Sequence, residues 1–97
     1  MEFKGTKGKW NYAIDSNKGF DVYLDNSIKI IAEVLFKDVS YMPNEKEAQA
    51  NAKLITYAPE MFEMLKTVYL SFGGGNVITF SEKDIEDFEQ LLTKITE

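Results

Sequence analysis

The first third of the chain holds three short segments in which apolar and polar positions alternate. The segments are rich in aromatic and β-branched side chains, and turn-forming residues separate them. This pattern predicts three β-strands over residues 9–14, 20–25 and 28–36. Because the connections are short, we expect the strands to form an antiparallel meander.

Alternation also assigns the two faces of this sheet, since successive side chains of a strand point to opposite sides. The predicted core-facing set is Trp10, Tyr12, Ile14, Phe20, Val22, Leu24, Ile28, Ile30, Ala32, Val34 and Phe36. On the other face of the third strand, Ile31 and Leu35 alternate with charged residues. A three-stranded sheet also has two open edges. We expect self-association to cover them and these two aliphatic side chains, and we therefore predict a homo-oligomer.

After the strands, the apolar positions recur at intervals of three and four, which is the period of an amphipathic helix. Asn44 and Glu47 have the spacing of a capping box at its start. Pro59 falls on the apolar stripe and interrupts the helical hydrogen bonds. Residues 45–72 therefore form one kinked helix or a pair, and we favour two helices with a bend at Ala58 and Pro59. The stripe comprises Ala48, Ala52, Ile55, Phe62, Leu65, Tyr69 and Phe72.

The end of the chain predicts a further helix over residues 82–96. Ser81 and Asp84 form a second capping signal. Three glycines at 73–75 end the preceding helix, and residues 76–80 form a strand-like link. The apolar stripe of the last helix is Ile85, Phe88, Leu92 and Ile95.

These elements predict an α+β fold in which the three-stranded meander packs on the helices. At 97 residues the chain has room for one core, so we expect a single domain over residues 1–97. No segment has the apolar length of a membrane span or of a secretory signal. With a net charge of −5, the chain is also a poor general binder of nucleic acid. We expect a cytoplasmic protein that contacts neither membrane nor nucleic acid.

The inventory of side chains excludes several kinds of chemistry. The chain has no cysteine and no histidine, and all 11 of its basic residues are lysines. Disulfides, Cys/His zinc sites and catalysis by a histidine base are therefore ruled out. We expect no cofactor, no metal and no enzymatic activity, because general acid–base catalysis most often uses histidine. An enzyme that uses only carboxylates and lysines is the minor alternative.

One candidate site is suited to a phosphorylated ligand. Backbone amides of a glycine turn can hold a phosphate, while lysines neutralise its charge and an aromatic ring stacks on a base. The candidate ligand-binding residues are Lys9, Trp10, Lys18, Gly73, Gly74, Gly75 and Ser81. The plainer interpretation is that the glycines only end a helix and that the aromatic residue belongs to the core.

A second candidate site is the acidic first half of the last helix. Glu82, Glu86 and Glu89 share one helix face by their spacing of four and three. This face could bind a basic protein partner. The plainer interpretation is a solvated surface whose carboxylates are favoured by the helix dipole.

A more specific signal lies in residues 47–66, EAQANAKLITYAPEMFEMLK. This segment resembles the pattern E-A-x-A-N-A-[RK]-L-I-x-x-A-P-E-[LM]-[LF]-E-x-L of a large family of small phage and prophage proteins of mostly unassigned function. Those proteins also have an early Trp, as at Trp10, and strands that end in an I-A-x-V-like segment, as at residues 31–34. The resemblance supplies no catalytic residues.

The resemblance implies a phage accessory protein in the host cytoplasm. Our leading hypothesis is a homo-oligomeric counter-defence inhibitor that acts by binding, either by sequestration of a small nucleotide signal or by capping of a host defence protein. The alternative is a structural or regulatory adaptor of phage development. The adaptor would bind a protein partner through the acidic C-terminal helix.

Overall fold

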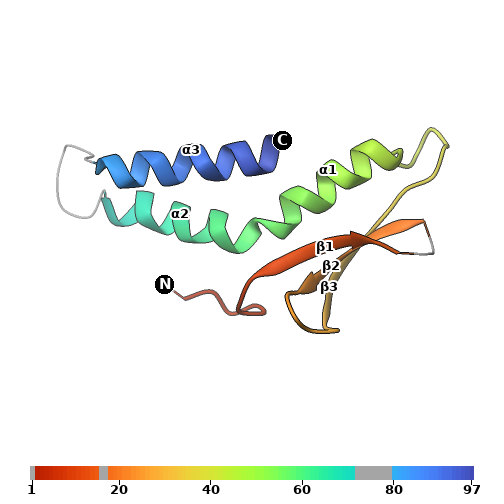
Figure 1. Ribbon diagram of the computed structural model, residues 1–97, viewed down its shortest axis with the longest axis horizontal. Helices are drawn as coiled ribbons and strands as arrows, with labels where there is room; N and C mark the ends of the chain where they lie inside the picture. The colour runs from red at the N-terminus through yellow and green to blue at the C-terminus, as the bar shows by residue number, and fades with distance from the viewer. Residues whose placement is uncertain (1, 16–17, 72–79) are drawn as a thin grey trace.

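A computed structural model describes residues 2–15, 18–71 and 80–97, and it has the predicted α+β architecture (Figure 1). Three strands form an antiparallel sheet in the order β1-β2-β3, and three helices follow. The strands are β1 (Trp10–Ile14), β2 (Gly19–Leu24) and β3 (Ile30–Leu35). The helices are α1 (Glu45–Thr56), α2 (Ala58–Ser71) and α3 (Glu82–Thr96). The predicted glycine turn, and the predicted link up to residue 79, lie outside the described residues.

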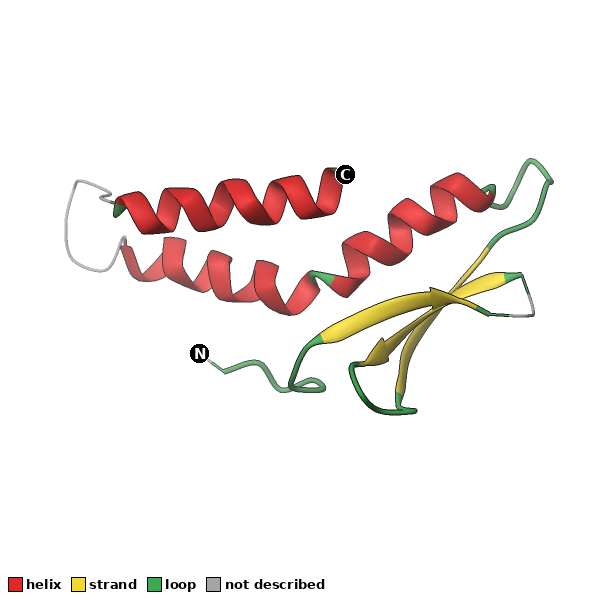
Figure 2. Ribbon diagram, viewed as in Figure 1, coloured by secondary structure: helices red, strands yellow, loops and turns green. Residues whose placement is uncertain are grey.

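The helices divide into two parts with different surroundings. Helix α1 lies over one face of the sheet and contacts all three strands. Helices α2 and α3 run antiparallel, side by side, and extend away from the sheet (Figure 2). The molecule is therefore elongated, with extents of 50 × 28 × 21 Å.

The core lies between the sheet and α1. Val22 at the centre of β2 is fully buried, as are Ala48 and Ala52 on α1. Because alanine carries only a methyl group, α1 can lie close to the strands. Trp10 and Phe20 complete the buried cluster. The prediction that Ala48 and Ala52 lie on the apolar side of this helix is confirmed.

Strand β3 departs from regular alternation through a β-bulge. Val22 pairs with Ala32, and Tyr23 pairs with Ile30. Ile31 is therefore an extra residue, and it packs against the core. The bulge shifts the phase by one position, so Ile28 and Ile30 are 97% and 49% exposed. The predicted facing of these three isoleucines was wrong, whereas Ala32, Val34 and Phe36 pack against the core as predicted.

The break between α1 and α2 lies where proline predicts it. Helix α1 begins with the capping box, in which the Glu47 N–H donates to Asn44 Oδ1 at 2.9 Å. It ends at Thr56, and after Tyr57 the next helix starts with Pro59 in its first turn. Backbone N–H groups in the first turn of a helix have no carbonyl acceptor within that helix. A proline, which lacks the N–H, therefore loses no helical hydrogen bond there. Two helices, and not one kinked helix, are the outcome.

The predicted apolar stripes of the last two helices are only partly buried. On α2, Leu65 and Tyr69 are 68% and 58% exposed, because this part of the helix extends beyond the sheet and is not covered by it. On α3, Ile85 and Leu92 are exposed. The buried residue of α3 is Leu91, which the stripe did not include.

Three carboxylates gather on the sheet face opposite α1. Asp21 pairs directly with Glu33 across β2 and β3, and its Oδ1 is buried without a hydrogen-bond partner. Burial, a hydrogen bond with Asp15 and the negative charges of Asp15 and Glu33 raise the pKa of Asp21. The folded protein thus holds this proton more tightly than the unfolded chain. The resulting stabilisation is complete below the ordinary pKa of 3.8 and is lost as the pH rises through the raised value.

We expect Asp21→Asn to raise the thermal midpoint at pH 7 by a few degrees, on the order of 5 °C or less, because it removes an ionised group from this acidic cluster. The difference from the native chain should shrink as the pH falls through the raised pKa of Asp21 toward 3.8. Thermal scans by circular dichroism over this pH range measure it. Asp38→Asn changes an exposed acid outside the cluster and serves as the control. A lowered midpoint at pH 7 for Asp21→Asn would contradict the prediction.

Candidate binding groove

A groove of about 550 Å³ lies between the N-terminal segment and the α2–α3 pair. One wall is formed by residues 2–8, and the other walls come from the first three turns of α2 and the first half of α3. The apolar lining residues are Phe3, Pro59, Phe62, Met64 and Phe88. The charged lining residues are Glu2, Lys7, Glu60, Glu63, Lys66, Asp84 and Asp87. The groove therefore combines an aromatic interior with charged groups.

Aromatic contacts hold the N-terminal wall in place. The ring centroid of Phe3 lies 5.6 Å from that of Phe62 and 6.2 Å from that of Trp10. The Trp10 indole Nε1–H donates to the carbonyl of Thr6 at 3.1 Å. An exposed ion pair of Lys7 with Glu2 adds little, because water screens it. Trp10 thus connects the core of the sheet to the wall of the groove.

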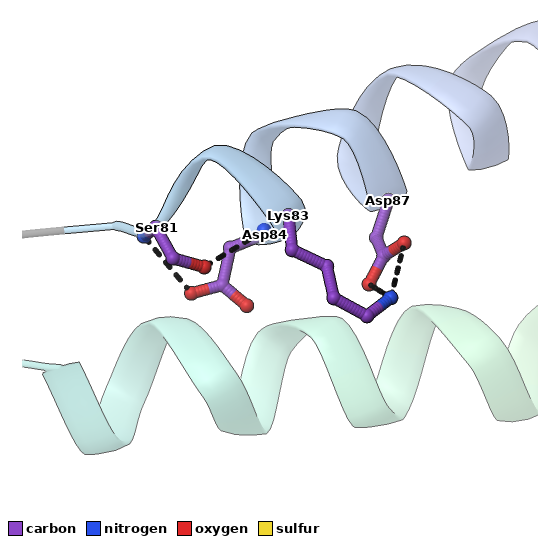
Figure 3. Close-up of polar contacts among 4 residues, drawn as sticks. All are labelled: Ser81, Lys83, Asp84 and Asp87. Carbon is purple, nitrogen blue, oxygen red and sulfur yellow. Dashed lines mark hydrogen bonds and ion pairs between the residues drawn. The ribbon is translucent and has the colours of Figure 1, made fainter.

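Helix α3 is fixed at its start by the second capping box (Figure 3). The Asp84 N–H donates to Ser81 Oγ at 3.1 Å, and the Ser81 N–H donates back to Asp84 Oδ2 at 3.3 Å. One turn further on, Lys83 pairs with Asp87 at 3.3 Å. The Phe80 ring packs edge-on against Phe88. These contacts place two carboxylates and one aromatic ring of α3 on the groove.

The charge of the groove is predominantly negative. Five carboxylates and two lysines line it. The Oε2 atom of Glu60 is buried and has no hydrogen-bond partner. A smaller cavity of about 300 Å³ shares Glu60, Met64 and Asp87 with the groove and also contains Lys9 and Lys94. No cluster of metal-ligating side chains occurs in the described part of the chain.

Four of the residues predicted to bind a nucleotide are described, and they lie on different parts of the structure. Lys9 and Lys18 are exposed at opposite ends of β2, and six strand residues separate those ends by about 20 Å. Trp10 is 9% exposed and part of the core, so it offers no stacking face. Ser81 serves as a helix cap. Gly73, Gly74 and Gly75 lie outside the described residues.

The acidic residues predicted to bind a partner are all exposed. Glu82, Glu86 and Glu89 lie on α3, and none of them lines either cavity. The carboxylates of α3 that line the groove are Asp84 and Asp87, which the sequence analysis did not single out as binding residues. It also missed the groove residues of the N-terminal segment. The one available signal was the segment 47–66, which contains Pro59, Glu60, Phe62 and Glu63.

Comparison with known protein families shows which family the chain is related to, which the groove alone does not show. The family model described as Salmonella phage P22 protein Y8K6 matches residues 1–94. The chain belongs to this phage protein family. The match takes in the N-terminal segment, the sheet, α1, α2 and most of α3, and so includes every residue of the groove. The expected relationship to small phage proteins is confirmed.

No curated protein and no solved structure matches the chain. Among the described helices, none has the length and apolar character needed to cross a membrane.

Proposed function

We propose that this phage protein is a non-catalytic accessory protein that acts in the host cytoplasm by binding, and that it caps a protein component of a host defence system. The observation that supports a protein target is the composition of the groove. Its aromatic lining is surrounded by five carboxylates and two lysines. A phosphorylated nucleotide would place its negative charge against those carboxylates. We therefore favour capping of a protein over sequestration of a nucleotide.

The chemistry of the groove describes the partner segment that it would accept. A lysine or arginine side chain would pair with Glu63 and with the unpartnered oxygen of Glu60. An adjacent apolar side chain would pack against Phe62 and Phe88. The net charge of −5 would speed the approach of a basic surface, so the association rate should fall as salt is added.

Capture of a partner from host lysate, followed by calorimetry with the purified partner, tests the proposal. We expect Glu63→Lys to weaken binding at least about tenfold, because it reverses one charge of the groove. Glu89→Lys is the matched control, since it makes the same change at an exposed position of α3 outside the groove. Circular dichroism must show that both variants fold. Equal binding by the native protein and Glu63→Lys would contradict a role for the groove.

The same measurements distinguish the adaptor hypothesis from capping through the groove. Its supporting observation is that Glu82, Glu86 and Glu89 are exposed on one helix. If reversal of these three charges abolishes capture while Glu63→Lys retains it, the partner binds the outer face of α3.

The nucleotide hypothesis predicts that a cyclic or linear nucleotide raises the thermal midpoint of the protein, and that Lys9→Ala weakens this effect. We expect no such rise.

A further inference from the structure

Strand β1 forms one edge of the sheet, and its hydrogen bonds show which backbone groups face outward (Figure 2). In an antiparallel pair, a strand turns its N–H and C=O groups toward its neighbour at every second residue. The Asp15 N–H donates to the Gly19 carbonyl of β2, and the Lys9 carbonyl accepts from an N–H beyond the other end of β2. Odd-numbered residues therefore face β2. The residues that turn their backbone groups to the open edge are Trp10, Tyr12 and Ile14.

The open edge of β1 has none of the usual features that prevent strand pairing. No charged residue, proline or bulge interrupts residues 10–14. Among the residues that the structure describes, no strand pairs with this edge. The Tyr12 N–H donates to the side-chain oxygen of its neighbour Asn11 at 2.9 Å, a bond that a backbone carbonyl of an added strand can replace. The edge is therefore suited to a further strand.

The other edge of the sheet, formed by β3, is protected. A bulge interrupts β3, and Glu33 places a charge on it. The Phe36 N–H donates to the Lys18 carbonyl, so the residue after Phe36 turns its N–H outward. That residue, Lys37, donates to the carbonyl of Pro43 at 3.1 Å. The chain itself thus occupies the place that an added strand would take at this end of β3.

A second copy of β1 fits the open edge in a defined register. If two copies pair antiparallel about a twofold axis at Tyr12, all five residues of each strand find a partner. Trp10 then lies opposite Ile14 of the other copy, and each pair of outward-facing residues exchanges two hydrogen bonds. A register shifted by one residue in either direction leaves one end of each strand unpaired.

The charges that flank β1 are complementary in this register. Lys9 precedes the strand and Asp15 follows it at the same distance from Tyr12, so each lies opposite the other in the second copy. Alternation places both on the outer face of the sheet, where Asp15 contacts Asp21. Lys9 of one copy thus lies beside the carboxylate cluster of the other. Exposed pairs of this kind contribute little energy each, so their main effect is to select the register.

We propose that two copies of this chain join through β1, so that their two sheets form one continuous antiparallel sheet. The twofold axis is perpendicular to this sheet, which leaves each α1 on the same face, over its own strands. Ile14, which is 57% exposed in the single chain, is then covered beside Trp10 of the other copy. No residue from 9 to 15 lines the groove, so the dimer does not depend on the partner proposed for it.

Light scattering coupled to size exclusion, over a range of protein concentrations, tests the register. We expect the native chain to be a dimer and Asp15→Lys to raise its dissociation constant by about tenfold or more, because like charges then lie opposite each other at two points. Asp15 lines neither cavity. Combining Asp15→Lys with Lys9→Glu should restore the native value to within about threefold. Asp38→Lys is the matched control, since it changes an exposed acid outside the sheet.

Amide hydrogen exchange followed by NMR locates the contact. We expect the amides of Trp10, Tyr12 and Ile14 to exchange more slowly as the protein concentration rises. Glu33 and Leu35 are the matched positions, since they turn outward on the other edge and should not change. Ile14→Pro removes one outward N–H and leaves the hydrogen bonds to β2 intact, so this variant should be a monomer.

The other outcomes overturn the proposal. A native chain that is monomeric at every concentration has no such interface. Slower exchange at Glu33 and Leu35, in place of the β1 amides, would put the contact on the other edge of the sheet. A dimer that survives Ile14→Pro does not pair through β1, and a double variant as weak as Asp15→Lys contradicts the register. Circular dichroism distinguishes dissociation from unfolding in each variant.

Discussion

Replacement of Trp10 by alanine should lower the free energy of unfolding by about 4 kcal/mol, the largest effect expected for one side chain of this protein. Trp10 belongs to the buried cluster under α1, and its ring also contacts Phe3. Alanine would leave a cavity at this junction and would remove the hydrogen bond from the indole to Thr6. Since typical domains are stable by only 5–15 kcal/mol, this loss would remove a large share of the stability of the fold.

Urea denaturation followed by circular dichroism measures this effect, because the variant has no tryptophan fluorescence. Tyr41→Ala is the control, since that aromatic side chain is 80% exposed and should cost less than about 0.5 kcal/mol. Trp10→Phe should fall between the two and should still weaken binding in the groove, because the hydrogen bond to Thr6 is lost. A cost below about 1 kcal/mol for Trp10→Ala would show that the core does not depend on this residue.

Ala52→Leu should destabilise the fold by about 3 kcal/mol, through crowding and not through a cavity. Ala52 is fully buried where α1 meets the sheet, so three added carbon atoms would push the helix away from β2. Ala50→Leu makes the same change on the exposed side of α1 and should alter the free energy of unfolding by less than about 0.5 kcal/mol. Thermal unfolding of the two variants side by side gives the comparison. Equal stability of both would mean that α1 can shift to accommodate the larger side chain.

The features that were predictable from the sequence are those with local causes. Asn44 and Ser81 each satisfy a free amide within three residues, so both helix starts could be located. Pro59 interrupts the helical hydrogen bonds at its own position, whatever the rest of the chain packs against it. The turn-forming residues between the strands also act locally, through their own backbone preferences, so the meander could be predicted from them.

The features that were not predictable depend on contacts between distant segments. The bulge at Ile31 changes which isoleucines face the core, and strict alternation cannot show an extra residue in one strand. The groove needs Phe3 against Phe62, two residues that are far apart in the chain. No spacing rule relates them. The uncovered side of α2 likewise follows from where the sheet ends and not from the sequence of the helix.

The position of Glu2 and Phe3 in the groove wall decides where a purification tag belongs. A tag fused ahead of Glu2 starts at the groove itself. A flexible tag with basic residues would act as a tethered competitor, at an effective concentration in the millimolar range, and would mask a weaker partner. The other end of α3 lies near α1, at a distance from the N-terminal segment (Figure 1). Fusion after Glu97 therefore leaves the groove free for capture experiments.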